Sequence, residues 1–506
     1  MDSQEQSLIQ SFMRRSRELI DLKSVLEILT WDQETMMPSR AGPFRARQFS
    51  ALSALYHQKL TSPDLGETLE RLSTEELGLW PQAAVREMRR EHEKAVKLPE
   101  ELVRELAETT SLAYGAWVEA RQKSDFASFS PWLEKVLKLK QEEARCLQFS
   151  DSLYEALLDH YEPGMTVGRL DELFAVIRPN LTSLLHQILS ASKQPDRDLL
   201  KGKFPVAQQE AFGRDVLTAM GFQWDAGRLD RSPHPFCSGL SPLDVRITTR
   251  YSEEDFCSSL FGMIHEGGHA LYEQGLDPEH YGSLACDGIS LGIHESQSRL
   301  WENQIARSRA FWDHWFPRLL QTFPGQLDHV SLKDFVHAIN RVEASLIRVE
   351  ADEISYGLHV ILRYELEKQM VEGDLKVQDL EEAWNTSMKE YLEVVPSNSA
   401  EGVLQDVHWS QGAFGYFPTY LLGNLYGAQI FHQVRKELPD LEGTIAEGNL
   451  MPLREWLGKQ IHGKGKTVSA EELIEKISGK PLSSDYFLDY LKNKFTPLYG
   501  LSPDDA

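Results

Sequence analysis

The chain has 506 residues, of which 41% are hydrophobic and 26% charged, as in ordinary folded enzymes. Its formal net charge of −24 argues against nucleic acid as a partner, because proteins that bind nucleic acid carry a basic face. No apolar run approaches the roughly 18 residues that cross a membrane, and the N-terminus lacks the apolar core of a secretory signal, so we expect a cytoplasmic protein without a membrane partner.

Helical periodicity dominates the chain. Apolar residues recur at a spacing near 3.6 over residues 8–26, 98–122, 132–158, 168–192, 331–371 and 378–394. Near the C-terminus, Ser469 and Glu472 form the capping-box pattern of a helix start. Because no repeat and no Gly/Ser linker divides the chain, we predict a single all-α domain over residues 1–506.

One stretch, residues 229–251, departs from this pattern. It is rich in turn residues and ends in the alternating Val245, Ile247 and Thr249, which predicts a short strand or hairpin. A strand edge beside a functional site could hold an extended peptide by its backbone. A plain connector is equally consistent with the sequence.

The next helix is predicted from Ser252, with Asp255 three residues on, to about Gln274, with Gly275 as its stop. An apolar stripe on it should face the core. The stripe consists of Phe256, Leu260, Ile264 and Leu271.

Within this helix, His265 and His269 are four residues apart, so both rings can face one metal ion. Glu266 lies one position round the helix, where it can act as a general base on a water at the metal. Gly267 and Gly268 each destabilise a helix interior by roughly 1 kcal/mol. Close approach of another backbone or of a substrate would explain their presence.

Two histidines at this spacing also occur by chance, so a third ligand is decisive. The metzincin pattern requires Gly and then His after the motif, and those places hold Tyr272 and Gly275. A second helical pattern over residues 288–308 offers His294, Glu295 and Glu302. The residues alone leave both His294 and Glu295 open as the third ligand.

Four cysteines, Cys146, Cys237, Cys257 and Cys286, form no CxxC pair, which predicts buried thiols in a reducing compartment. Cys257 and Cys286 flank the histidine helix and are a less favoured alternative as metal ligands.

Seven motifs then point to a known family. They are WDQETMMP at 31–38, HPF at 234–236, DVRIT at 244–248, HEGGH at 265–269, HESQSRLWEN at 294–303, IRVEAD at 347–352 and GVLQDVHW at 402–409. Over most of its length the chain resembles the carboxypeptidase Taq family of zinc-dependent metallocarboxypeptidases. The resemblance implies His265, His269 and Glu295 as the metal ligands, Glu266 as the catalytic base and one Zn²⁺ per subunit.

The resemblance also implies a fold and an activity. The expected fold is almost wholly helical, with two helical halves around a long deep active-site cleft. The expected activity is the release of C-terminal amino acids, with broad specificity, from peptides that have a free C-terminal carboxylate. The family commonly forms homodimers and is not secreted. The ligand types leave Co²⁺ or Mn²⁺ open beside zinc.

A carboxypeptidase must bind the terminal carboxylate, and a guanidinium can do so with two hydrogen bonds. Arg348 in IRVEAD and Arg246 in DVRIT are the candidates, although Arg348 could instead pair with Asp352 in the same predicted helix. The donor to the oxyanion is expected among His408, Tyr416, Tyr420 and Tyr426, although buried tyrosines often only pack. Contacts with the peptide backbone are expected from His234 and Gln405. Orientation of histidines or arginines is expected from Asp244, Asp406 and Asp352.

Two further patterns are interpreted as structural. GKGKT at 463–467 lacks the first glycine of a phosphate loop, since that place holds Gln460, and is predicted to be a solvated turn. WDQETMMP is predicted to fix the N-terminal helices over the cleft. Two other functions are considered, an oligopeptidase that cuts within peptides and a catalytically silent peptide-binding protein. The intact Glu266 argues against the second.

Overall fold

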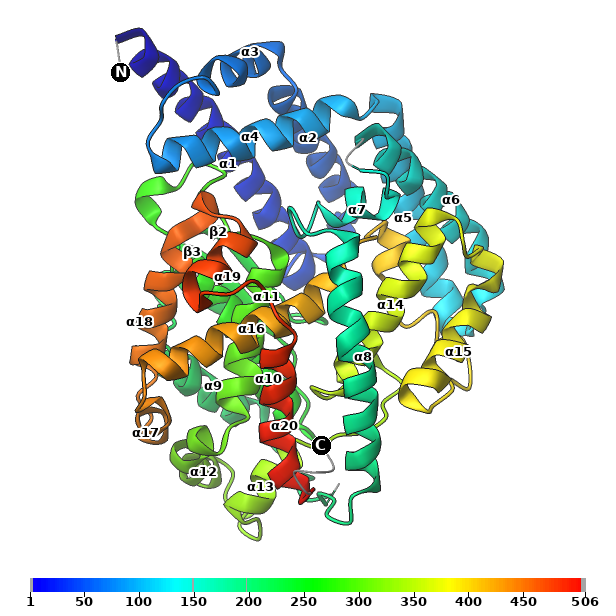
Figure 1. Cartoon of the computed structure of the whole chain (residues 1–506), viewed down its shortest axis with the longest axis vertical. Coiled ribbons are helices and arrows are strands. Elements are labelled where there is room, and N and C mark those ends of the chain that lie inside the picture. The colour runs from blue at the N-terminus through cyan, green and yellow to red at the C-terminus, as the bar shows by residue number, and fades with distance from the viewer. Residues whose placement is uncertain (1–2, 148–149, 197, 502–506) are drawn as a thin grey trace.

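The computed structural model describes residues 3–147, 150–196 and 198–501, which form a mainly helical protein with one small sheet (Figure 1). This confirms the predicted all-α fold with a short β element. Among the described helices, none is long and apolar enough to cross a membrane.

Four N-terminal helices form one packing unit. They are α1 (Ser3–Thr35), α2 (Gly42–Leu60), α3 (Pro63–Leu72) and α4 (Leu79–Lys97). They surround a small apolar cluster of their own, which includes Phe12, Leu65 and Met88 and to which Leu284 and Ala285 of a later loop contribute. In Figure 1 α3 and α4 lie at the top of the molecule, and α1 runs down from there toward its middle.

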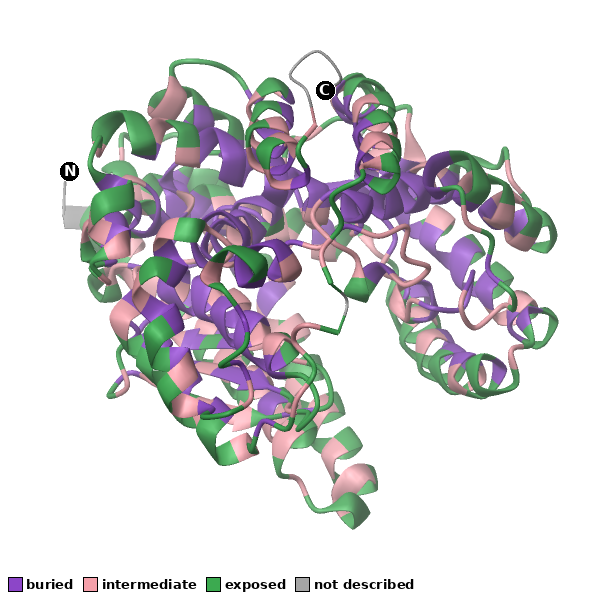
Figure 2. Cartoon of the chain, turned by 90° about the horizontal axis from the view of Figure 1, so that it is seen from below, coloured by how far each residue is buried: buried purple, intermediate pink, exposed green. Residues whose placement is uncertain are grey.

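The remaining helices lie on two sides of one continuous apolar core (Figures 1 and 2). One side holds α5 (Glu100–Lys123), α6 (Phe126–Leu147), α7 (Leu153–Leu158), α8 (Val167–Ser190), α14 (Ser355–Glu372) and α15 (Leu380–Leu392). The other side holds α9 (Val206–Met220), α10 (Phe256–Glu273), α11 (Leu291–Arg299), α12 (Arg309–Thr322), α13 (Leu332–Ile339), α16 (Pro418–Glu437), α17 (Leu441–Ala446), α18 (Met451–Gln460), α19 (Ala470–Ser478) and α20 (Asp485–Tyr499). Ser469 caps α19 with the predicted capping box.

The sheet contains β1 (Gly227–Arg231), β2 (Cys237–Ser241) and β3 (Asp244–Thr249), in the order β1-β3-β2. The central β3 runs parallel to β1 and antiparallel to β2. Val245, Ile247 and Thr249 are all fully buried, as the alternation predicted. β2 is an edge strand and contacts α10, so the sheet lies directly beside the histidine helix.

Trp31, in the WDQETMMP motif, attaches α1 to this sheet. The Trp31 side chain is buried, and the guanidinium carbons of Arg228 and Arg246 lie 4.7 and 4.4 Å from the centre of its ring. Cation–π contacts of this kind stabilise the attachment. The motif therefore holds the N-terminal helices in place, as predicted.

The structure corrects three predictions of helix extent. Residues 331–371 are not one helix, because 340–354 form an irregular loop with a short 3-10 turn, Arg348–Glu350. Residues 132–158 divide into α6 and α7. The cap of α10 is Asp255 rather than Ser252, since the Asp255 carboxylate accepts the backbone N–H of Ser258 at 3.1 Å.

The GKGKT segment is not a solvated turn. It forms a 3-10 turn, His462–Thr467, in which Gly465 has a positive φ of 49° and is buried. A Cβ on Gly465 would lie 2.3 Å from the carbonyl oxygen of Ala285, so only glycine fits this approach. The Lys466 ammonium lies 3.2 Å from the Asp287 carboxylate. The segment therefore packs against the loop that precedes α11.

Candidate metal centre

The histidine helix α10 is fixed in the core by its predicted apolar stripe. The side chains of Phe256, Leu260, Ile264 and Leu271 are each at most 2% exposed. Burial of such side chains stabilises the fold by roughly 1.5–3 kcal/mol each. The stripe thus determines which way the opposite face of α10, with its two histidines, points.

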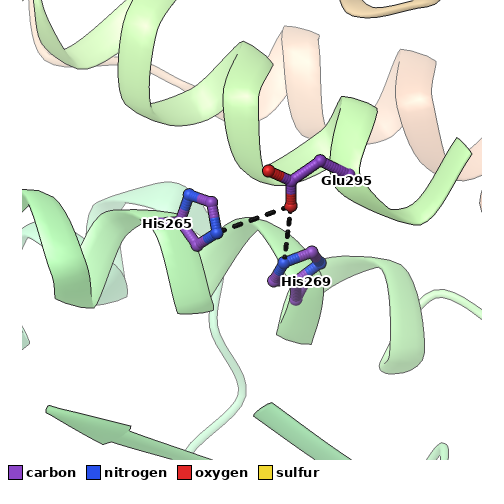
Figure 3. Close-up of side chains that lie close together, drawn as sticks. All are labelled: His265, His269 and Glu295. Carbon is purple, nitrogen blue, oxygen red and sulfur yellow. Dashed lines mark ion pairs between the residues drawn. The ribbon is translucent and has the colours of Figure 1, made fainter. Parts of the chain in front are cut away.

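His265 and His269 of α10 and Glu295 of α11 point toward one another (Figure 3). The Nε2 atoms of His265 and His269 lie 3.6 and 3.3 Å from Oε2 of Glu295. Ligand atoms of the three residues lie within 4.8 Å of one another, and no other group of three such residues meets this spacing in the part of the chain that the structure describes. These three side chains can therefore hold one metal ion.

Glycines make this convergence possible. A Cβ on Gly268 would lie 2.6 Å from Cα of Ser298, so α10 can approach the backbone of α11 only with glycine here. A Cβ on Gly423 of α16 would lie 2.4 Å from Cγ of Glu295. Gly267 instead faces a flexible side chain, Leu217. Close helix packing thus explains glycine in the HEGGH motif.

His294 is oriented away from this group of ligand atoms. Its Nδ1 lies 2.6 Å from Nδ1 of His269, and its Nε2 lies 2.7 Å from Oε1 of Glu273. The Glu273–His294–His269 chain places the Nδ1 hydrogen of His269 toward His294. The lone pair on Nε2 of His269 then remains available to a metal ion.

Glu302 has the same role for His265, since its Oε2 lies 3.0 Å from Nδ1 of that ring. Burial would raise the pKa of Glu302, but the His265 hydrogen bond and the charges of Arg299 and Arg307 outweigh it and hold that pKa well below its usual range. These contacts of Glu302 with His265 and of Glu273 with His294 were not predicted from the sequence. The seven-residue spacing from Glu295 to Glu302 is a helical signal that could have placed Glu302 on the same face.

Glu266 is 7% exposed and is one of the residues that line the adjacent cleft. Burial raises its pKa to about 7, and the negative charge of Glu295 acts in the same direction, while His265 opposes it. A carboxyl group with this pKa can both accept and release a proton near neutral pH.

The cleft has a volume of about 700 Å³ and extends well beyond the three converging side chains. Its walls come from α1, α2 and α4, from β2, from the loop after α7, from α10 and α11, and from α16. Tyr416 and Tyr420, two of the expected donors, both line it. Tyr426 does not, because its hydroxyl donates to Oε1 of Glu162 in the interior at 3.0 Å.

His408 lies behind Tyr420, with Nε2 at 3.1 Å from the Tyr420 hydroxyl oxygen. Burial lowers the pKa of His408 to about 3, so the ring is neutral. His408 is not among the described residues that line the cleft. It therefore contacts Tyr420 rather than the space that a peptide would occupy.

Arg348 is buried beside the same tyrosine, its guanidinium carbon 4.8 Å from the centre of the Tyr420 ring. Nε and Nη2 of Arg348 donate to Oδ1 of Asp406 at 3.0 and 2.9 Å. The alternative pair with Asp352 is wrong, because residues 340–354 are not helical. Gln405 accepts the backbone N–H of Arg348 at 2.9 Å, so it supports this loop and does not face the cleft.

Asp406 lies between two buried arginines, since Nε of Arg363 also donates to its Oδ2 at 2.6 Å. Burial alone would raise the pKa of Asp406, but the charges of Arg348 and Arg363 hold it far below its usual range. Asp406 thus orients arginine, as predicted. Asp352 does not, because its carboxylate accepts the backbone N–H groups of Glu343 and Ile354 and shapes the loop.

Arg246 and His234 are also not among the described residues that line the cleft, although Pro235, next to His234, is. Nε and Nη2 of Arg246 each lie 2.9 Å from the carboxylate of Asp244, which orients it against Trp31. His234 is exposed to solvent. The cations that do line the cleft are Lys23, Arg90 and Lys466, which no sequence motif identified.

The four cysteines are free and partly exposed rather than fully buried. Cys257 and Cys286 are not part of the metal-ligating group in the described chain. Cys237 on β2 lines the cleft, where burial raises the pKa of its thiol well above the ordinary value.

Comparison with known proteins identifies the family to which this site belongs. The family model of carboxypeptidase Taq (M32) metallopeptidases matches residues 11–495. The chain belongs to this family. Thermostable carboxypeptidase 1 of Thermus thermophilus is 45% identical over 505 residues, which cover 97% of this chain and 99% of the relative. Carboxypeptidase 1 of Bacillus subtilis is 39% identical, over 94% of this chain and 95% of the relative.

A solved structure of an M32 carboxypeptidase has a closely similar fold. The crystal structure of the M32 carboxypeptidase from Deinococcus radiodurans R1 superposes with a TM-score of 0.95 at 38% identity, over 98% of this chain and 100% of that one. The M32 chain described here is therefore a metallocarboxypeptidase, which uses a divalent metal ion and acts on peptides.

Proposed function

We propose that this M32 enzyme is a zinc carboxypeptidase whose single ion is held by His265, His269 and Glu295. The convergence of these three side chains is the observation that carries the proposal. Two imidazoles and a carboxylate are a common donor set for catalytic zinc, with a fourth position for water or substrate. Co²⁺ or Mn²⁺ would also suit these ligands.

Glu266 is proposed as the catalytic base. When bound, the ion would polarise the scissile carbonyl and lower the pKa of a water molecule. Glu266 accepts the proton of the attacking water and transfers it to the leaving amine. Its pKa of about 7, raised by burial, suits both transfers.

Tyr416 and Tyr420 are proposed to donate hydrogen bonds to the oxyanion. Burial raises the pKa of both hydroxyls, to about 12 for Tyr416, so both remain protonated donors. If Nε2 of His408 donates to the Tyr420 oxygen, the Tyr420 hydrogen is free to point into the cleft. His408 would thus position Tyr420 without touching the peptide.

Arg348 is proposed as the receptor for the terminal carboxylate, with Arg246 as the weaker alternative. Arg348 lies directly behind Tyr420, and its Nε–Nη2 edge is occupied by a single oxygen of Asp406. In Arg246, by contrast, Nε and Nη2 donate to both carboxylate oxygens of Asp244. Arg348 is buried and is not among the described residues that line the cleft, so this proposal requires Tyr420 to move when the carboxylate binds.

The edge strand β2 is proposed to hold the peptide backbone. Cys237 and Gly239 of β2 line the cleft, and the edge of a strand can pair with an extended peptide. The proposal concerns the part of β2 before Leu240, because the Leu240 carbonyl already accepts the hydroxyls of Ser24 and Tyr281. His234, three residues before the first residue of β2 and next to Pro235, which lines the cleft, remains a candidate contact. The family model runs without interruption from residue 11 to 495, which supports one catalytic unit.

Homodimer formation and a cytoplasmic location are proposed from the family resemblance. Light scattering of the purified enzyme would test the first, and fractionation of the source cells the second.

The activity is tested by mass spectrometry of two digests with zinc-loaded enzyme. One substrate is a short peptide with a free C-terminus, and the other is the same peptide amidated. We expect losses of single C-terminal residues from the free peptide alone. In an Arg348→Lys variant, the difference in cleavage rate between the free and the amidated peptide should be smaller. Internal cleavage of both peptides would identify an oligopeptidase. If the metal-loaded protein cleaved neither peptide, the result would favour the catalytically silent peptide-binding protein.

A further inference from the structure

The loop after α7 connects the N-terminal helices to the helix that carries Glu295. At its start, the Asp159 carboxylate lies 2.8 Å from Nη2 of Arg90 and 2.7 Å from Nζ of Lys94, both on α4. Two residues later, the Tyr161 carbonyl accepts the backbone N–H of Leu291, the first residue of α11, at 3.0 Å. Tyr161 itself lines the cleft.

Glu162 is the next residue of this loop and is only 1% exposed. Its Oε2 accepts the backbone N–H of Gly292 in the first turn of α11 at 2.9 Å. Its Oε1 accepts the hydroxyls of Ser290, the N-cap of α11, at 2.9 Å and of Tyr426 on α16 at 3.0 Å. One carboxylate thus links the start of α11 to α16.

This link bears directly on the metal centre because Glu295 lies three residues after Gly292, within one helical turn. The α11 helix has little freedom to adjust, since Gly268 of α10 and Gly423 of α16 contact it at distances that only glycine permits. A shift at the start of α11 would therefore be transmitted to the Glu295 carboxylate.

We propose that Glu162 is a positioning residue, which holds the first turn of α11 so that Glu295 faces His265 and His269. This inference rests on the ligand set of the proposed function.

Two substitutions separate the effect of the hydrogen bonds that Glu162 accepts from the effect of its charge. In Glu162→Gln, the amide oxygen can face the Gly292 N–H, and the hydroxyls of Ser290 and Tyr426 can turn to accept from the amide nitrogen. In Glu162→Ala all three partners lose their acceptor. Zinc affinity should therefore fall in Glu162→Ala and stay near normal in Glu162→Gln.

Glu367 provides a matched control. It is fully buried and also accepts three hydrogen bonds, from the Tyr154 hydroxyl, the Trp409 indole and the Gly415 N–H. Burial raises the pKa of Glu162 and of Glu367 alike to about 7. Glu367 lies on α14 and none of its three partners belongs to α10 or α11. Its loss should destabilise the fold without altering the metal centre.

The experiment measures the dissociation constant of zinc by competition with a chromogenic chelator, together with the melting temperature of the metal-free protein. We expect Glu162→Ala to weaken zinc binding by about tenfold, the lower end for residues that orient metal ligands. Glu162→Gln should bind within about threefold of the unsubstituted enzyme. Glu367→Ala should bind zinc normally, although its melting temperature falls. Equal zinc affinity in all variants, or equal weakening in both alanine variants, would overturn the inference.

Gly292→Ala is the second variant, used if Glu162→Ala does not fold. Its Cβ would lie 2.6 Å from Oε2 of Glu162, so it displaces the same contact from the other side. His265→Ala tests the underlying ligand set separately. Should His265→Ala bind zinc as the unsubstituted enzyme does, the proposed metal centre is wrong, whereas loss of zinc in His265→Ala with no effect in Gly292→Ala rejects only the role of Glu162.

Discussion

Two regions of the active site are built in different ways. The residues proposed to hold the metal lie on two regular helices, α10 and α11, which touch along glycine contacts such as Gly268 against Ser298. Arg348, which is proposed to receive the substrate carboxylate, lies in the irregular segment 340–354. The buried ion pairs of Asp406 with Arg348 and Arg363 hold this segment against a second irregular segment, 402–417. Regular helices hold ligand atoms at constant spacing, whereas an irregular wall keeps its shape only through specific polar contacts.

This comparison predicts that the two regions respond differently to substitution. Changes in the helical region should alter metal binding or chemistry while leaving the fold largely intact. Changes in the irregular region should destabilise the wall itself, because its buried charges depend on one another.

The largest effect is expected from Glu266→Gln. This substitution removes the proposed base but no metal ligand, so kcat should fall by about 10²–10⁴-fold. Zinc content, measured by atomic absorption, should remain at that of the unsubstituted enzyme. Activity within a few fold of normal would show that another group accepts the proton.

Asp406→Ala should affect stability rather than metal binding. It leaves Arg348 and Arg363 buried without their common carboxylate, and removal of one partner from such a network costs about 3–5 kcal/mol. Denaturant unfolding with zinc held constant should show this loss. Asp244→Ala is the control, because its partner Arg246 lies closer to solvent, and it should cost much less. If the free energy of unfolding fell by a similar amount in both variants, the proposed difference between the two regions would be contradicted.

Gly268→Ala should weaken the contact between α10 and α11. Its Cβ would lie 2.6 Å from a backbone atom of α11, and such overpacking typically costs about 1–3 kcal/mol. Zinc affinity should fall as well, because the histidines move relative to Glu295. Gly267→Ala is the matched control, since its Cβ would meet the movable side chains of Leu217 and Met220 and no backbone atom of another helix. If both variants bind zinc equally well, the close approach at Gly268 is not what aligns the ligands.

The smallest effect concerns pH. Burial raises the pKa of Glu367 to about 7 from an ordinary 4.5, so the folded protein holds this proton more tightly than the unfolded chain. The stabilisation is complete below pH 4.5 and is lost as the pH rises through 7. Between about pH 5 and 8 the free energy of unfolding should therefore fall by about 2 kcal/mol more in the unsubstituted enzyme than in Glu367→Gln. Parallel pH dependence in the two proteins would show that Glu367 is ionised throughout.

Much of the helical region could be predicted because its signals are local. The spacing of His265 and His269, the apolar stripe from Phe256 to Leu271 and the alternation in β3 each depend only on the period of one element. These predictions are confirmed, although the N-cap of α10 is Asp255, three residues later than predicted. The Asp255 carboxylate accepts the backbone N–H of Ser258, and so caps the helix in place of Ser252.

The irregular region could not be predicted in this way. Periodicity indicated one helix through 331–371, but the carboxylate of Asp352 binds backbone N–H groups and stabilises a loop there instead. As a result Arg348 does not pair with Asp352 four residues on, and its partner is Asp406, 58 residues away. A local sequence pattern cannot predict a contact between residues so far apart in the chain.

The sequence by itself therefore determined the helical architecture, the shared face of His265 and His269 and the adjacent Glu266, since all follow from spacing along a single helix. It left His294 and Glu295 as equal alternatives when their residue types alone were considered. Only the tertiary structure decided between them, because the packing of α11 against α10 and α16 directs Glu295 toward the Nε2 atoms of both histidines and His294 toward Glu273. Which side chains converge depends on how helices pack, and that is decided by contacts between residues far apart in the chain.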